Sequence, residues 1–150
     1  MTEKIFNIEE IIEIIQKCEY CNMAMVDLDG MPYVIPMNFG YKDNFIFFHS
    51  GPNGKKINCL KNNPNICLSF STDHKLRFQN EGVACSYSMK FNSTLLNGVA
   101  EFVENREEKI QALNIIMAHY ADREFKYSEP AIKNVVIFKM KIQGGCVRRK

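Results

Sequence analysis

An Asp29-Gly30 pair between two apolar runs is the feature of this sequence that most constrains its fold. The runs cover residues 23–27 and 31–39, and Asp-Gly in this setting is a strong signal for a β-hairpin. A further turn at residues 40–44 precedes an aromatic run at residues 45–49. These three apolar segments predict a meander of antiparallel strands.

Helical spacing of apolar residues occurs in three other parts of the chain. Isoleucines recur at helical spacing behind Asn7, a candidate N-cap with Glu10 three residues later, and predict a helix over residues 7–18. A short helix is expected over residues 55–61, and a third helix, capped by Asn105, over residues up to about 121.

The remaining apolar segments predict further strands. These are residues 65–71, one or two strands within residues 82–103 joined near residues 89–92, and residues 135–142, while residues 72–79 are expected to form a loop. The element order α-β-β-β-α-β-β-α-β has mostly antiparallel neighbours. It predicts a mainly β protein with peripheral helices, in which about six to seven strands form a barrel. No linker divides the 150 residues, so we expect one domain over residues 1–150.

Composition and charge exclude several classes of protein. The longest uninterrupted apolar runs have four residues, whereas roughly 18 are needed to span a bilayer, so we expect no membrane partner. A net charge of +2 argues against nucleic-acid binding, and we expect the basic cluster at residues 148–150 to be a solvated tail. The acidic start at residues 2–10 does not resemble a signal peptide, and six cysteines are typical of free thiols in the cytoplasm.

Residues 49–56, His-Ser-Gly-Pro-Asn-Gly-Lys-Lys, contain the richest set of functional groups. Glycines allow close approach of a ligand, and Lys55 and Lys56 fall at the start of a predicted helix, where free N–H groups favour an anion. The spacing is not that of a Walker loop, and a solvated turn is the alternative interpretation. His49 ends the aromatic strand one residue before this turn, at a position where small-molecule sites are often built.

The other candidate ligands have simpler interpretations. Cys18 and Cys21 have the spacing of a zinc or redox pair, but the second half of such a site is missing. We therefore expect two half-buried thiols and no metal site. We expect His74 to be a loop residue and His119 to be a surface or core residue of a helix. No Ser or Cys lies in a nucleophile elbow.

Several segments taken together resemble one family. Residues 29–40, 47–50 and 54–56, followed by residues 84–104 and the helix segment 113–120, occur in that family's order and spacing. They resemble the FMN-binding relatives of pyridoxamine 5′-phosphate oxidase, and within them the nitroimidazole-resistance (Nim) branch. The resemblance covers nearly the whole chain.

This resemblance implies a split β-barrel homodimer that carries FMN. The implied cofactor-binding residues are Pro36, Met37, Asn38, His49, Ser50, Gly54, Lys55, Lys56, Ser93 and Thr94. The last two would complete the site from a neighbouring strand or from the partner subunit.

The resemblance also implies how these residues would contact the cofactor. The backbone of residues 36–38 would run beside the isoalloxazine ring. His49 and Ser50 would lie near the edge of the flavin and its ribityl chain. Lys55 and Lys56 would hold the phosphate.

The sequence departs from the family in three places. Val34 stands where the oxidases have a basic residue, so the two lysines, with Arg77, would carry more of the phosphate binding. Residues 143–148 do not match the oxidases' substrate-binding stretch, which argues against oxidation of pyridoxine phosphate. Asn92 stands where many Nim-like chains have a basic residue, so the resemblance does not define the outer pocket.

Three functions are compatible with these features. The first is an FMN-dependent reductase of a small electron-poor acceptor, such as a nitro compound, with NAD(P)H as candidate electron donor and His49 as the catalytic group that donates a proton or a hydrogen bond. The second is a non-catalytic flavin carrier or stress protein, in which His49 only packs. The third is a barrel that binds haem.

Overall fold

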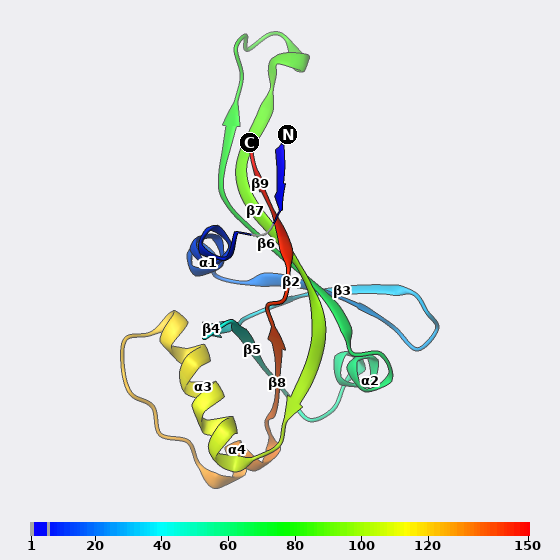
Figure 1. Ribbon diagram of the computed structural model, residues 1–150, viewed down its shortest axis with the longest axis vertical. Helices are drawn as coiled ribbons and strands as arrows, with labels where there is room; N and C mark the ends of the chain where they lie inside the picture. Colours follow the sequence, from blue (N-terminus) through cyan, green and yellow to red (C-terminus); the bar gives the residue numbers. More distant parts are fainter. Residues whose placement is uncertain (1, 6) are drawn as a thin grey trace.

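Nine strands form one continuous antiparallel sheet in the computed structural model, which describes residues 2–5 and 7–150 (Figure 1). Met1 and Phe6, at the acidic N-terminal stretch, lie outside the described residues. The strands are β1 Thr2–Ile5, β2 Cys21–Val26, β3 Pro32–Met37, β4 Gly40–Lys42, β5 Phe45–Ser50, β6 Asn65–Arg77, β7 Ser88–Val103, β8 Val136–Lys141 and β9 Gly145–Arg149. The helices are α1 Ile8–Lys17, α2 Lys55–Asn62, α3 Arg106–Tyr120 and α4 Glu129–Asn134, with a 3-10 turn at Ala84–Ser86. The predicted mainly β split barrel with peripheral helices is confirmed.

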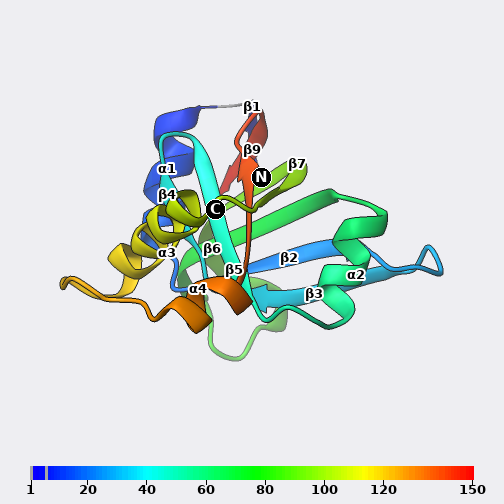
Figure 2. The same ribbon diagram turned by 90° about the horizontal axis from the view of Figure 1, so that it is seen from below.

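The long strand β7 organises the sheet. The strand order is β3-β2-β6-β7-β8-β5-β4, and β9 pairs with both β7 and β1. One edge of β7 pairs with β6, while its other edge pairs first with β9 and then with β8. Figures 1 and 2 show that β7 therefore passes from the protruding part of the sheet into the barrel.

The core is formed by the sheet together with buried side chains of helices α1 and α2. Its largest fully buried side chains include Phe39, Phe48, Phe70 and Phe138. Asn7 caps α1 as predicted, because its Oδ1 accepts hydrogen bonds from the amides of Glu9 at 3.1 Å and Glu10 at 3.4 Å. None of the helices in the described ranges is long and apolar enough to cross a membrane.

The predicted Asp29-Gly30 hairpin is also confirmed. Strands β2 and β3 pair from Cys21 opposite Met37 to Val26 opposite Pro32. The side chain of Asp27 accepts hydrogen bonds from the amides of the turn, and Gly30 has φ = 79°, a conformation that favours glycine.

The predicted three-stranded meander is wrong, because β5 pairs with β4 and β8 rather than with β3. The chain leaves the sheet after β3 and turns over the core at Phe39, which is fully buried. At Gly40 it passes so close to α3 that a Cβ atom would lie 2.6 Å from the Cα of Ile116. Residues 40–42 form a strand instead of part of the predicted turn. The turn itself is limited to Asp43 and Asn44, which both have positive φ.

A long two-stranded arm replaces the loop expected at residues 72–79. Strand β6 continues to Arg77, and β7 runs without a break through residues 89–92. A bulge between Thr72 and Lys75, with Asp73 at φ = 58°, interrupts the pairing. The arm extends away from the barrel at the top of Figure 1. Both faces of the arm are largely exposed, so its strands lack the apolar alternation from which a strand is predicted.

The C-terminus is a strand rather than the expected solvated tail. Strand β9 pairs with residues 92–96 of β7 and with β1. Val147, which directly precedes the basic residues 148–150, is 1% exposed and anchors the strand in the core. Sequence patterns also missed β1 and the short helix α4, which is capped by Ser128.

Candidate functional site

A cavity of about 580 Å³ lies where the end of β3, the end of β5, the start of α2 and the loop before β2 meet. Its lining residues are Tyr20, Asn22, Pro36, Met37, Asn38, His49 and Lys56. Five of these seven were predicted to contact a cofactor, so residues 36–38, His49 and Lys56, which lie on three different elements or loops, converge here as the resemblance implied.

Residues 36–38 form one wall of the cavity. Strand β3 is the last strand of the sheet and, among the described residues, pairs only with β2, so one of its edges has no strand partner there. Met37 is buried, whereas Pro36 and Asn38 are exposed. An open strand edge presents backbone N–H and C=O groups that a planar heterocycle with both donors and acceptors can pair with.

Lys56 places a cation in the cavity without an anionic partner. Its Nζ lies 3.6 Å from the sulfur of Met37, which is only a weak acceptor, and it forms no ion pair with any residue that the structure describes. Partial burial lowers the pKa of Lys56 below its ordinary value. Because burial of an unpaired charge is unfavourable, an anion beside Lys56 would relieve this cost.

The start of α2 adds further donors beside Lys56. The first helical hydrogen bond runs from the amide of Asn58 to the carbonyl of Gly54 at 3.2 Å, so the amides of residues 55–57 precede it. No side chain caps this end, and no acidic residue lies in the first turn. Gly54, at φ = 131°, turns the chain into the helix in a conformation that favours glycine. The helix dipole and these amides favour an anion at this position.

His49 provides an imidazole that titrates near neutral pH in proteins. It lies on β5 opposite Ile137 of β8, between the buried Phe48 and Ser50. Its ring makes no hydrogen bond with the rest of the described chain. Desolvation of the ring, and secondarily the Lys56 ammonium, lower the pKa of His49 below its ordinary value. A ring of this kind is mainly neutral at pH 7 and keeps one N–H to donate.

Lys55 and Gly54 lie on the other side of this helix start. The Nζ of Lys55 is 3.7 Å from Oδ2 of Asp27 and 4.4 Å from the ring centre of Tyr33. Gly54 and Lys55 line a different cavity, beside the β2–β3 turn. The two adjacent lysines therefore differ: Lys55 faces a carboxylate, and Lys56 does not.

The remaining predicted contacts do not line the cavity. Ser50 is buried on β5, beside His49. Ser93 and Thr94 lie on β7, where they pair with residues of both β6 and β9. The hydroxyl of Thr94 donates to the carbonyl of Cys146 at 2.9 Å and is fully buried. Contact of these three residues with a cofactor stays a prediction.

Two cavity residues, Tyr20 and Asn22, were not anticipated. Asn22 lies directly opposite Pro36 in the hairpin. The register that follows from the Asp29-Gly30 turn could have identified it, because it places Asn22 beside the predicted wall. Tyr20 is in the loop between α1 and β2 and is 54% exposed. Only the path of that loop, which no sequence pattern indicates, brings it to the cavity.

The cysteines and the other two histidines lie outside this cavity. Cys18 and Cys21 are buried free thiols, and burial raises the pKa of Cys21 to about 12. No group of three potential metal ligands occurs in residues 2–5 and 7–150. His74 is on β6 rather than in a loop. Nε2 of His119 donates to the carbonyl of Cys18 at 2.6 Å.

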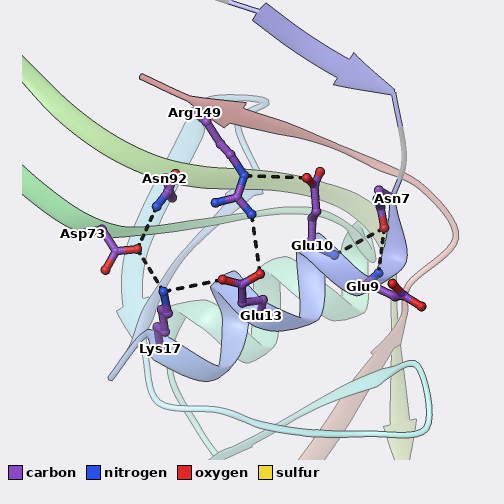
Figure 3. A network of polar contacts seen from close by, with 8 residues as sticks. All are labelled: Asn7, Glu9, Glu10, Glu13, Lys17, Asp73, Asn92 and Arg149. Carbon is purple, nitrogen blue, oxygen red and sulfur yellow. Dashed lines mark hydrogen bonds and ion pairs between the residues drawn. The ribbon is translucent and has the colours of Figure 1, made fainter.

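A second set of polar groups joins α1 to the base of the arm (Figure 3). We call it the α1 network; it consists of Asn7, Glu9, Glu10, Glu13, Lys17, Asp73, Asn92 and Arg149. Oδ2 of Asp73 accepts from Asn92 at 2.7 Å and from Lys17 at 3.3 Å. Arg149 faces Glu10 at 3.8 Å and Glu13 at 3.7 Å. Asn92, whose role the resemblance left open, is thus held by Asp73.

The cavity fits the phosphate and ring of FMN in its chemistry. Its described lining residues include an ammonium and an imidazole but no carboxylate. Residues 36–38 line one part of the cavity, and Lys56, in the first turn of α2, lines another. The chemistry of this cavity in a split barrel is compatible with an anionic, planar cofactor.

Comparison with known proteins assigns the family. The profile of the pyridoxamine 5′-phosphate oxidase family matches residues 7–149. The chain belongs to this family of flavin-binding proteins, which confirms the resemblance. Among curated proteins, none matches the sequence.

Solved structures agree with this assignment. A candidate 5-nitroimidazole antibiotic resistance protein from Bacteroides thetaiotaomicron is 42% identical, and the match covers 97% of this chain and 87% of that protein with a TM-score of 0.85. A flavocytochrome from Azotobacter vinelandii is 18% identical, with 99% and 69% coverage and a TM-score of 0.85. An FAD- and haem-binding protein from Mycobacterium smegmatis is 13% identical, with 100% and 74% coverage and a TM-score of 0.86. The last two support the fold alone.

Proposed function

We propose that this protein binds FMN in the cavity and reduces small electron-poor acceptors, such as nitro compounds. The observation that carries the proposal is the unpaired Lys56 ammonium beside the uncapped start of α2, in a cavity whose described lining includes His49 and no carboxylate. The 42% identity to a candidate nitroimidazole resistance protein supports the choice of acceptor.

In this proposal each wall of the cavity has one task. Lys56 and the amides of α2 bind the phosphate, and the backbone of residues 36–38 orients the ring. Lys55, which already faces Asp27, contributes less than Lys56. FMN fits better than riboflavin, which lacks the phosphate, and better than FAD, whose adenylate would have to pass the start of α2.

The flavin supplies hydride transfer when bound, and the chain supplies position and protons. His49 donates a hydrogen bond to the acceptor from its neutral ring. At a pH below its lowered pKa, the ring carries a second proton that it can pass to the reduced acceptor. NAD(P)H is the proposed source of electrons.

We also propose that the protein is a homodimer in the cytoplasm. Large apolar side chains remain exposed along the arm: Leu76, Phe78, Val83, Tyr87 and Met89. A second copy of the chain would cover such a surface, and a stable interface of this kind buries more than about 2,000 Å² in total. A partner subunit could then bring further groups to the flavin. Sedimentation should show a dimer, and a monomer with full flavin content would contradict this proposal.

The proposed location in the cytoplasm is supported by the cysteines. All six are free thiols, which suit a reducing compartment.

An absorption spectrum followed by anaerobic turnover tests the proposed activity. The purified protein should show flavin bands, whereas a Soret band would indicate haem instead. After reduction by NAD(P)H or dithionite, a nitroaromatic compound should reoxidise the bound flavin in stopped-flow experiments. Flavin that stays reduced in the presence of the acceptor would favour a non-catalytic carrier.

A further inference from the structure

One hydroxyl group connects two walls of the cavity from outside it. The amide of Phe39 donates to Oη of Tyr120 at 3.0 Å, and the same hydroxyl donates to the carbonyl of Glu19 at 2.7 Å. Phe39 directly follows Asn38, and Glu19 directly precedes Tyr20. Tyr120 therefore bridges the backbones of two segments whose neighbouring residues, Asn38 and Tyr20, both line the cavity.

The bridge is supported by the packing around it. Phe39 is fully buried, and its ring lies 4.5 Å from that of His119 and 5.0 Å from that of Phe70. His119 holds the same loop one residue earlier, at Cys18. The close approach of Gly40 to Ile116 leaves α3 no room to move toward the strand. Thus His119 and Tyr120, at the end of α3, hold both segments by hydrogen bonds.

The hydroxyl has the hydrogen-bonding capacity that this task requires. A phenol oxygen can accept one hydrogen bond and donate another, and both are used. Burial raises the pKa of Tyr120 above its usual value, so the donated proton is retained at neutral pH. Phenylalanine at this position would keep the ring but leave one amide and one carbonyl without their partner.

We propose that Tyr120 is a positioning residue, which fixes the separation of Tyr20 and Asn38 and so sets the width of the cavity for a planar cofactor. The proposal rests on the proposed flavin site and adds to it a residue that does not line that site. Because a planar ring needs two walls at a defined distance, the loss of the bridge lowers affinity for the ring itself. This effect differs from a loss of phosphate contacts, which would leave riboflavin binding unchanged.

The test is Tyr120→Phe, with Tyr127→Phe as its matched control. The hydroxyl of Tyr127 donates to Oδ1 of Asn114, also on α3, at 2.9 Å and lies outside the cavity lining. We expect Tyr120→Phe to weaken both FMN and riboflavin about tenfold, as the loss of two hydrogen bonds predicts. Iodide should also quench the fluorescence of the bound flavin more strongly. Tyr127→Phe should leave both readouts at the wild-type values, even where the two variants lose similar thermal stability.

Two results would overturn the proposal. One is wild-type flavin affinity and quenching in Tyr120→Phe, and the other is an equal loss in Tyr127→Phe, which would indicate general loosening of α3. Should Tyr120→Phe fail to fold, hydrogen exchange in the wild-type protein decides. Because coupling is reciprocal, saturation with FMN must slow exchange of the Phe39 amide, and an unchanged rate contradicts the proposal. Failure of the wild-type protein to bind FMN at all would instead refute the proposed function.

Discussion

The cavity and the α1 network are two polar clusters on the same barrel, and they differ in how their charges are compensated. In the α1 network, Lys17 and Arg149 each face two acidic groups, and Asp73 accepts hydrogen bonds from two donors. In the cavity, the Lys56 ammonium contacts the thioether of Met37, and the ring of His49 has no hydrogen-bond partner in the described residues.

The cavity, and not the α1 network, has a charge that a ligand could compensate. Opposite charges that face each other leave little for an added ion to gain, so the α1 network is expected to hold α1, the bulge and β9 together. A partly buried cation without an anion gains free energy when a ligand supplies that anion. The adjacent lysines repeat the contrast within one helix turn, since Lys55 faces Asp27 and Lys56 does not.

The largest effect should come from replacing the imidazole of the cavity, His49. His49→Ala should retain FMN and slow reoxidation of the reduced flavin by a nitroaromatic acceptor about 10²-fold, the usual scale for lost acid–base catalysis. Stopped-flow absorbance measures this rate. Partial recovery in His49→Gln would indicate a hydrogen-bonding role, because glutamine can donate a hydrogen bond but cannot deliver a proton. A fully flavin-loaded Ala variant that reoxidises at the wild-type rate would show that His49 only packs.

The next effect tests the contrast between the two lysines. Lys56→Ala should weaken FMN binding at least tenfold, because a charge-assisted hydrogen bond to phosphate contributes roughly 1.5–3 kcal/mol. Lys55→Ala should change FMN affinity less, and the double variant should leave riboflavin binding nearly unchanged. Fluorescence titration of the apoprotein measures all three. Equal losses for Lys55→Ala and Lys56→Ala would contradict the different roles of the two lysines.

The α1 network should contribute modestly to stability and not to flavin binding. Arg149→Met keeps the aliphatic stem but removes the charge that faces Glu10 and Glu13. We expect a loss of about 0.5 kcal/mol in the free energy of unfolding, since partly exposed ion pairs contribute little. Urea denaturation measures this loss, and FMN affinity serves as the control. A clear fall in FMN affinity would show that the two clusters are coupled.

The smallest effect concerns pH and the stability of the apoprotein. Because the folded protein lowers the pKa of His49 below 6.5, the folded state binds fewer protons there than the unfolded state. Stability from this source is present above pH 6.5 and is lost as the pH falls through the folded pKa. His49→Gln should abolish that part of the pH dependence in urea denaturation between pH 7 and pH 5. An identical profile in the variant would contradict the lowered pKa.

Local signals predicted much of the fold. The Asp29-Gly30 hairpin and the Asn7 cap depend on residues close in sequence, and both occur as expected. Strand β9 depends instead on distant partners in β7, and no periodicity in residues 145–149 distinguishes a strand from a tail. The same holds for one edge of β5, whose partner residues in β8 are 86 to 96 positions further along the chain, from Ser50 opposite Val136 to Phe45 opposite Lys141.

The site was predictable where the sequence itself carries the chemistry. The family resemblance assigned residues 36–38, His49 and Lys56 to one site, and these residues line one cavity. Tyr20 and the outward turn of Lys55 toward Asp27 could not be inferred, because both depend on the path of a loop and on one side-chain orientation. The bridge at Tyr120 likewise needs three segments in contact, which only the folded chain provides.

The most direct test of the account is a titration of the wild-type apoprotein with FMN and with riboflavin under identical conditions. We predict saturation at one FMN per chain and an affinity for riboflavin at least tenfold weaker, because riboflavin offers no anion to Lys56 and the start of α2. Equal affinities, or no binding of FMN, would contradict the claim that the uncompensated charge in this cavity marks a flavin phosphate site.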